Sequence, residues 1–116
     1  VRDDLRACLP ERHHRFFNEM AVHHVSGDYL FVHAGIRPGV PLQEQSDSDL
    51  LWIRRDFLES DADHGCVVVH GHSIREQVET RPNRIGIDTG AFHTGVLTCL
   101  VLEGADRRLL QTGVAT

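Results

Sequence analysis

The sequence predicts an α+β fold, in which an early helix precedes several strands that are mostly joined as hairpins. Three observations predict this class: short apolar runs bounded by glycine, two stretches with helical periodicity, and no repeated strand–helix–strand series. The length of 116 residues suits one small domain or one piece of a larger one. No apolar run approaches the roughly 18 residues that crossing a bilayer requires.

The beginning of the chain predicts a helix followed by a hairpin. Residues 9–20 (LPERHHRFFNEM) place Pro10 in the first turn, where it is tolerated, and space Phe and Met among charged residues, which indicates a short amphipathic helix. The runs 21–25 (AVHHV) and 29–32 (YLFV) flank a Ser-Gly-Asp turn signal, so they predict two paired strands. Prolines and glycines in 35–45 predict a loop.

The remainder predicts one more helix and up to four strands. Residues 49–59 (DLLWIRRDFLE) carry apolar side chains at helical spacing, with Asp47, Ser48 or Asp49 as the N-cap. The run 66–69 (CVVV) lies close to a glycine on each side and predicts a buried strand. Further strands are predicted at 84–88, 96–102 and 109–112.

Charge and cysteine content narrow the class of protein. A net charge of −5 and a pI near 5.9 argue against a general nucleic-acid binder. All 12 basic residues are arginine, so any cationic side chain that binds phosphate here is a guanidinium. Cys8, Cys66 and Cys99 are odd in number and lack CxxC spacing, which predicts a reducing compartment, the cytoplasm. Cys66 and Cys99 lie in apolar runs and are predicted to be small core residues.

Histidine is frequent, with nine in the chain, and two histidines are distinguished by position. His33 directly follows the predicted strand 29–32, and His72 follows the strand 66–69 in the segment HGHS. Polar groups just past buried strands are held on a rigid scaffold at a sheet edge, where functional residues collect. Neutral imidazole is a common ligand of zinc, iron and manganese-like ions. The pair is therefore a candidate for metal binding.

From spacing alone, however, the metal site is incomplete. A hydrogen-bonded structural role is the simpler interpretation of either histidine alone, and a catalytic metal usually takes three protein ligands. Asp88 is the best further carboxylate at a strand end, although Asp88-Thr89-Gly90 also fits a local Asx or Ser/Thr turn. The histidines in polar segments are predicted to be solvated: His13, His14 and His64.

Arg54 has two interpretations. The periodicity of 49–59 favours a surface arginine paired with Asp56 or Glu59, whereas an arginine that reached a pocket would bind phosphate oxygens through two donors. No serine or cysteine lies in a nucleophile elbow, and no glycine-rich phosphate loop is present. The residues by themselves indicate a soluble domain with a histidine-rich candidate metal edge, and they do not indicate a reaction.

Several segments occur in an order that is specific in combination. FVHAG, DLLWIR, VVVHGHS and RIGIDTGA, followed by TGVLTCLVLEG, lie between Gly27 and Gly104. They resemble the C-terminal half of bacterial and phage-type serine/threonine protein phosphatases, which belong to the calcineurin-like metallophosphoesterase superfamily. The resemblance implies that residues 1–116 form a single partial domain, the C-terminal half of a four-layer αββα sandwich. It implies a parent protein that is a metal-dependent phosphomonoester hydrolase, a protein-serine/threonine phosphatase.

The resemblance also implies individual roles. His33 and His72 would ligate the second of two divalent ions, which would be manganese, with iron or zinc as alternatives. Arg54 would bind the substrate phosphate and the transition state, and Arg37 would touch the substrate. His70 would be a neighbour in the pocket wall. A pair of such ions binds phosphate, activates water and stabilises an in-line displacement.

The family motifs GDxHG, GDxxDRG and GNHE do not occur in the chain. In the family they supply the ligands of the first ion, the acid histidine and a second arginine, so the chain resembles a fragment. We expect it alone to be inactive with Mn²⁺ and poorly soluble or partly unfolded, because half of a two-sheet core leaves apolar surface uncovered.

Two alternatives to the protein phosphatase stay open. One is a diadenosine tetraphosphate hydrolase-like phosphoesterase, and the other is a non-catalytic remnant or binding module. The expected partner is a phosphorylated protein or a small phosphoester, with neither nucleic acid nor a membrane as a partner.

Overall fold

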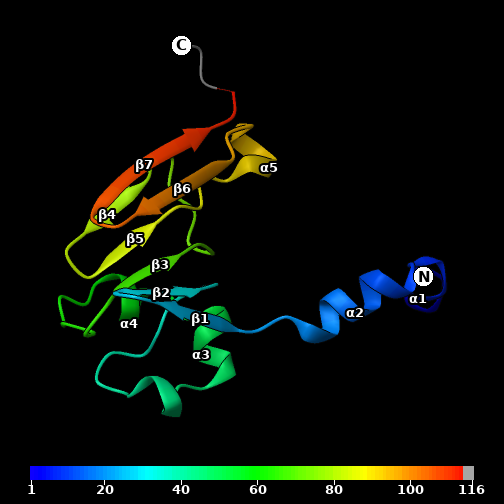
Figure 1. Ribbon diagram of the computed structural model, residues 1–116, viewed down its shortest axis with the longest axis horizontal. Coiled ribbons are helices and arrows are strands. Elements are labelled where there is room, and N and C mark those ends of the chain that lie inside the picture. The colour runs from blue at the N-terminus through cyan, green and yellow to red at the C-terminus, as the bar shows by residue number, and fades with distance from the viewer. Residues whose placement is uncertain (114–116) are drawn as a thin grey trace.

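A mixed five-stranded sheet organises the computed structural model, which describes residues 1–113 (Figure 1). Its strands are β1 (His23–Ser26), β2 (Tyr29–Val32), β3 (Val67–His70), β4 (Glu79–Arg81) and β5 (Arg84–Gly86). The strand order is β1-β2-β3-β5-β4. β3 runs parallel to both of its neighbours, and β1 and β4 pair antiparallel at the two edges. A separate hairpin pairs β6 (Thr98–Glu103) with β7 (Asp106–Gln111).

This arrangement confirms the predicted α+β class and corrects its connectivity. The hairpin predicted at 21–25 and 29–32 forms as β1–β2, and the run 66–69 forms most of the buried strand β3. The central strands are parallel instead of hairpin-connected, because residues 33–66 are long enough to cross from β2 to β3. β4 has no predicted counterpart, since its sequence ETR is polar and lies at the sheet edge.

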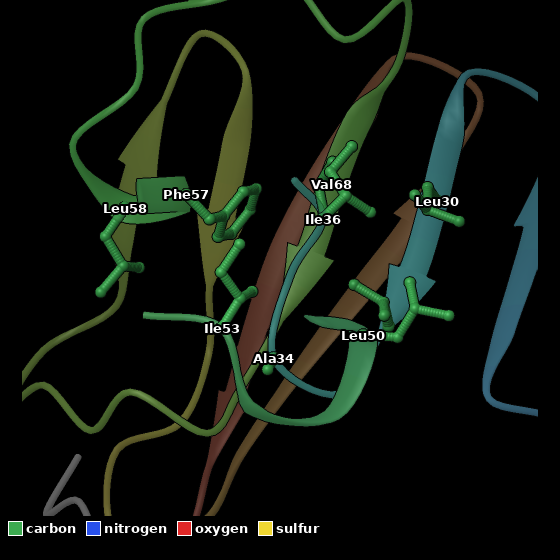
Figure 2. Packing of buried hydrophobic residues seen from close by; sticks show 9 residues of the cluster. Leu30, Ala34, Ile36, Leu50, Ile53, Phe57, Leu58 and Val68 are labelled. Carbon is green, nitrogen blue, oxygen red and sulfur yellow. The ribbon is translucent and has the colours of Figure 1, made fainter. Parts of the chain in front are cut away.

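The alternation of side chains along the central strands separates two faces of the sheet. Leu30 and Val68 point toward α3 (Asp47–Trp52) and α4 (Arg55–Leu58), whereas Phe31 and Val69 lie on the face that meets β6. Figures 1 and 2 show the two helices on one side of the sheet and the β6–β7 hairpin on the other. The body of the chain therefore has three layers.

The hydrophobic core lies between the sheet and the helices α3 and α4 (Figure 2). Phe57 and Val68 are fully buried, and Leu30 and Leu50 are nearly so. Burial of side chains of this size stabilises the fold by about 1.5–3 kcal/mol each. Stability is thus concentrated beside the strands that lead to the candidate site. The cluster comprises Leu30, Val32, Ala34, Ile36, Leu50, Ile53, Phe57, Leu58 and Val68.

The single helix predicted at 49–59 is wrong, because it is divided into α3 and α4. The carbonyl of Leu50 accepts the amide of Ala34 at 2.9 Å. In a continuous helix the same carbonyl would accept the amide of Arg54, so the tertiary bond competes with the helical one. The N-cap of α3 is Ser46, just before the predicted caps. The break leaves Arg54 exposed at the start of α4.

Two N-terminal helices, α1 (Arg2–Cys8) and α2 (Glu11–Glu19), extend away from the sheet (Figure 1). Neither buries a residue, and Phe16, Phe17 and Met20 are exposed. The radius of gyration is 16.1 Å, above the value of about 13 Å that a compact chain of this length would have. α2 confirms the helix predicted at 9–20, and no helix of residues 1–113 is long and apolar enough to span a membrane.

Two short helical elements were not predicted, and two side-chain predictions are wrong. A 3₁₀ turn (Leu42–Glu44) interrupts the loop predicted at 35–45, and α5 (Ala91–Thr94) precedes β6. Cys99 is exposed because it alternates with the inward-facing Thr98 on β6. His64 is half-buried rather than solvated, because its ring packs against Phe57 with centroids 5.8 Å apart.

Candidate metal and phosphate site

The two predicted strand-end histidines meet at the carboxyl ends of the neighbouring strands β2 and β3. His33 follows β2 and His72 follows β3, and parallel strands bring their carboxyl ends to the same edge. The two imidazole centroids lie 5.0 Å apart. The loops are tied together by a hydrogen bond from the Gly71 amide to the His33 carbonyl, at 2.8 Å. The topology therefore places two imidazoles side by side on rigid backbone.

His72 is held in an uncommon backbone conformation. Its φ is +65°, and the Ser73 amide donates across it to the Gly71 carbonyl at 2.7 Å. Its Nε2 atom is buried and has no hydrogen-bond partner within residues 1–113. Burial lowers the pKa of His72, and the positive charge of Arg54 lowers it further. A neutral ring with an unpartnered nitrogen is suited to ligating a metal ion.

Arg54 does not form the surface pair that its sequence context favoured. Within residues 1–113 no hydrogen bond or ion pair engages its guanidinium, whereas its neighbour Arg55 pairs with Glu59 at 3.4 Å. Arg54 is close enough to His72 for its charge to lower the pKa of that ring. An uncommitted guanidinium beside an imidazole pair can bind a phosphate through two donors.

Arg37, by contrast, is engaged by two carboxylates. Its Nε and Nη2 donate to both carboxylate oxygens of Asp49 at 2.9 and 2.8 Å, and its Nη1 donates to Asp56 at 2.9 Å. These bonds join the loop after β2 to α3 and α4, and they hold the pKa of Asp49 below its usual range. The geometry favours a structural role for Arg37 over the predicted contact with substrate.

A cavity of about 370 Å³ separates the sheet from β6 beside the histidine pair. Its walls are mostly apolar, with Phe31 and Val69 among them, and its polar lining includes His33, His72 and Asp88. Asp88 accepts the amide of Gly90 at 3.1 Å, which confirms the expected Asx turn. Neighbouring Thr89 donates to the Val96 carbonyl at 2.7 Å. The turn therefore connects the end of β5 to β6 at the cavity.

A buried polar pair beneath the site was not predicted. His70 and Arg84 are 2% and 1% exposed, and the Nη1 of Arg84 lies 3.1 Å from the Nε2 of His70. The same guanidinium donates to the Leu58 carbonyl at 3.2 Å and to the carboxylate of Glu79. The period-2 alternation of β3 could have placed His70 on the same face as Val68. A fully buried arginine in β5 had no comparable signal.

Stability is expected to fall in acid because of His70. Burial lowers its pKa from 6.5 to about 4, so the folded chain binds fewer protons than the unfolded one within that range. The contribution of the neutral His70 ring to the free energy of unfolding is fully present above pH 6.5. It is lost as the pH falls toward 4, by about 3 kcal/mol in total. Urea unfolding at pH 7.5 and 4.5 measures the loss. A His70→Asn variant keeps the other acid-sensitive groups, and an unchanged pH slope in it would contradict the assignment.

The donor set fits part of a metal site. Two imidazoles bound to one ion at about 2.1 Å in a roughly tetrahedral arrangement have ring centroids about 5 Å apart, which agrees with the 5.0 Å between His33 and His72. Residues 1–113 contain no group of three or more His, Cys, Asp or Glu side chains placed to hold one ion. The histidines therefore fit as two ligands and do not complete a catalytic metal site by themselves.

Comparison with solved structures shows a likeness of fold to one of them. The chain is similar to the crystal structure of a "putative diadenosine tetraphosphatase", with a TM-score of 0.72 and 17% sequence identity. The similarity covers 93% of this chain and 58% of the other, so the chain spans little more than half of that structure. The likeness is consistent with the predicted α+β fold class. A scan against models of known protein families finds no match, and a search of the curated proteins finds none either.

Proposed function

We propose that the chain carries part of the active site of a metal-dependent phosphoesterase. The observation that supports this most strongly is the imidazole pair of His33 and His72, whose centroids lie 5.0 Å apart. Arg54, which has no ion-pair partner within residues 1–113, lies near His72. A metal centre and a guanidinium are complementary to the negative charge of a phosphate ester. The architecture shared with the diadenosine tetraphosphatase structure is consistent with this chemistry.

Each residue has a distinct task in the proposal. His33 and His72 bind one divalent ion through neutral imidazole nitrogens, and the lowered pKa of His72 favours the neutral ring. Arg54 binds two phosphate oxygens and the charge that develops on them during transfer. Divalent ions in such a centre neutralise phosphate charge and make water more acidic. We propose manganese, with iron or zinc as alternatives, and the remaining ligands must come from outside residues 1–113.

Two substrate classes follow from two different observations. The segments FVHAG and VVVHGHS favour a phosphorylated serine or threonine in a protein, whereas the description of the similar structure favours a dinucleoside polyphosphate. We propose the phosphoprotein as the first candidate, acting in the cytoplasm, and the dinucleotide as the second. A third possibility, a binding module without catalysis, is separated from both by the assays below.

Arg54 provides the sharpest test of the proposal. In the complete gene product that contains this chain, Arg54→Ala is expected to lower kcat/KM for p-nitrophenyl phosphate with Mn²⁺ by about 100-fold or more. The control is Arg55→Ala, because Arg55 is an adjacent exposed arginine paired with Glu59. It should retain activity within about twofold. Loss of activity in the control and not in Arg54→Ala would refute the phosphate role.

The substrate class is decided with two compounds and one metal. The complete gene product is assayed with a phosphoserine peptide and with diadenosine tetraphosphate, each with Mn²⁺. Faster turnover of the peptide supports the protein phosphatase, and faster turnover of the dinucleotide supports the second candidate. A gene product that hydrolyses neither and binds Mn²⁺ weakly would overturn the enzyme proposal in favour of a binding module. The 116-residue chain alone is expected to be inactive.

A further inference from the structure

The two histidine loops meet at Gly71. Its amide donates to the His33 carbonyl at 2.8 Å, and its carbonyl accepts the Ser73 amide at 2.7 Å. The second bond closes a three-residue turn around His72, whose φ is +65°. A γ-turn with positive φ at its central residue is rare and strained, so it persists only where the surroundings hold it. The direction of the His72 side chain therefore depends on what fixes the Gly71 carbonyl.

His70 contacts that carbonyl from below. Its Nδ1 lies 3.1 Å from the Gly71 oxygen, and its Nε2 lies 3.1 Å from the Nη1 of Arg84. A guanidinium has donors and no acceptor, so the Nε2 of His70 must accept from it. The proton of the neutral ring is then on Nδ1, where it donates to the Gly71 carbonyl. That oxygen consequently accepts two hydrogen bonds, one from the His70 ring and one from the Ser73 amide.

Packing restricts the His70 ring from several directions. Phe57 meets it edge-on, with centroids 5.0 Å apart and the rings 86° to one another. Gly86 lies opposite His70 in the β3–β5 ladder, and a Cβ there would stand 3.1 Å from the Cε1 of the ring. Arg84 is itself fixed by the carboxylate of Glu79. The ring is thus confined by an aromatic ring, a glycine and a buried cation.

We propose that His70 is a positioning residue. Held by Arg84 with its proton on Nδ1, it fixes the Gly71 carbonyl and so maintains the strained turn that places His72 beside His33. The role needs no contact between His70 and substrate or metal. The inference deepens the proposed function, because its consequence for metal binding rests on that function. The hydrogen-bond geometry itself can be tested without it.

The tautomer of His70 is the first test. A long-range ¹H–¹⁵N correlation spectrum of the complete gene product with ¹⁵N-labelled histidine, recorded near neutral pH, reports which ring nitrogen carries the proton. We expect His70 to be protonated on Nδ1 alone. A proton on Nε2 would break the arrangement with Arg84 and would overturn the proposal, because no donor would then face Gly71.

Amide hydrogen exchange is the second test, with matched variants. In His70→Leu the Ser73 amide is expected to exchange about tenfold faster relative to the Val68 amide, which donates to Asn83 in the ladder. His70→Asn keeps a donor near the position of Nδ1 and should restore the ratio to within about threefold of the natural chain. If the ratio of the Ser73 to the Val68 exchange rate is the same in all three chains, the positioning role of His70 is refuted. If His70→Leu does not fold, the tautomer and the ratio in His70→Asn decide.

The third test uses Mn²⁺ alone as a probe and asks whether this turn affects metal binding at the proposed site. Paramagnetic broadening of the His33 and His72 ring signals is followed in the complete gene product as Mn²⁺ is added. We expect His70→Leu to need several-fold more Mn²⁺ than the natural chain and His70→Asn to need about the same. Equal sensitivity in all three chains would refute the effect of His70 on the ligand pair. An absence of broadening even in the natural chain would overturn the metal site of the proposed function, while tautomer and exchange would still decide the role of His70.

Discussion

Gly35→Ala is expected to lower the free energy of unfolding by about 3–4 kcal/mol. A Cβ at this position would lie 2.6 Å from the Cγ of Phe57, and the backbone φ of +156° disfavours any side chain. Phe57 is fully buried and packs against His70, so its ring cannot move aside without opening the core. Urea unfolding of the complete gene product, followed by far-ultraviolet circular dichroism, measures the loss.

Gly39→Ala is the matched control for this substitution. Gly39 has a φ of +80°, and a Cβ there would meet no atom within 4 Å. The control therefore has backbone strain without a clash, and we expect a loss of about 1 kcal/mol. Equal losses at the two glycines would mean that the collision with Phe57 is relieved at no cost, which would contradict the tight packing of the loop after His33 against α4.

Arg84→Met is expected to destabilise the chain by about 3–5 kcal/mol. The guanidinium is 1% exposed and donates to His70, Leu58 and Glu79. Methionine fills similar space but leaves the His70 nitrogen and the Glu79 carboxylate without their buried donor. The same unfolding measurement applies, at pH 7.5, where the carboxylate is charged.

Arg81→Met supplies the comparison for Arg84. The Arg81 side chain also donates to the Leu58 carbonyl at 3.2 Å, but it is exposed on the edge strand β4. Its loss should change the free energy of unfolding by less than about 1 kcal/mol, because water can replace an exposed donor. If both substitutions lower the free energy of unfolding equally, the burial of Arg84 does not explain its contribution to stability.

The sequence predicted the parts of the fold that depend on local pattern. The Ser-Gly-Asp turn signal located β1 and β2, a glycine-bounded apolar run located β3, and spaced aromatic residues located α2. The break between α3 and α4 could not be predicted, because it arises from the Ala34 amide reaching the Leu50 carbonyl across the fold. β4 was missed for a related reason, since a polar edge strand is defined by its partner β5 and not by its own composition.

The candidate site was predictable only in part. His33 and His72 could be identified because strand ends and glycines are visible in the sequence, and the structure brings them together. The sequence could not show which arginine lacks an ion pair, because Asp56 pairs with the distant Arg37 and not with its neighbour Arg54. The support from Arg84 was invisible as well, since a single arginine in an apolar run carries no sign of its burial partner.

The strand order has a consequence for how the chain folds. The pairs β1–β2, β4–β5 and β6–β7 are hairpins of strands adjacent in sequence, so each can form its hydrogen bonds as soon as its turn forms. β3 contacts β2 across residues 33–66 and β5 across 71–83, so each of its two pairings requires a long loop to close first. Insertion of β3 should therefore be the late, rate-limiting event, and the histidine pair comes into existence only when this last strand is seated.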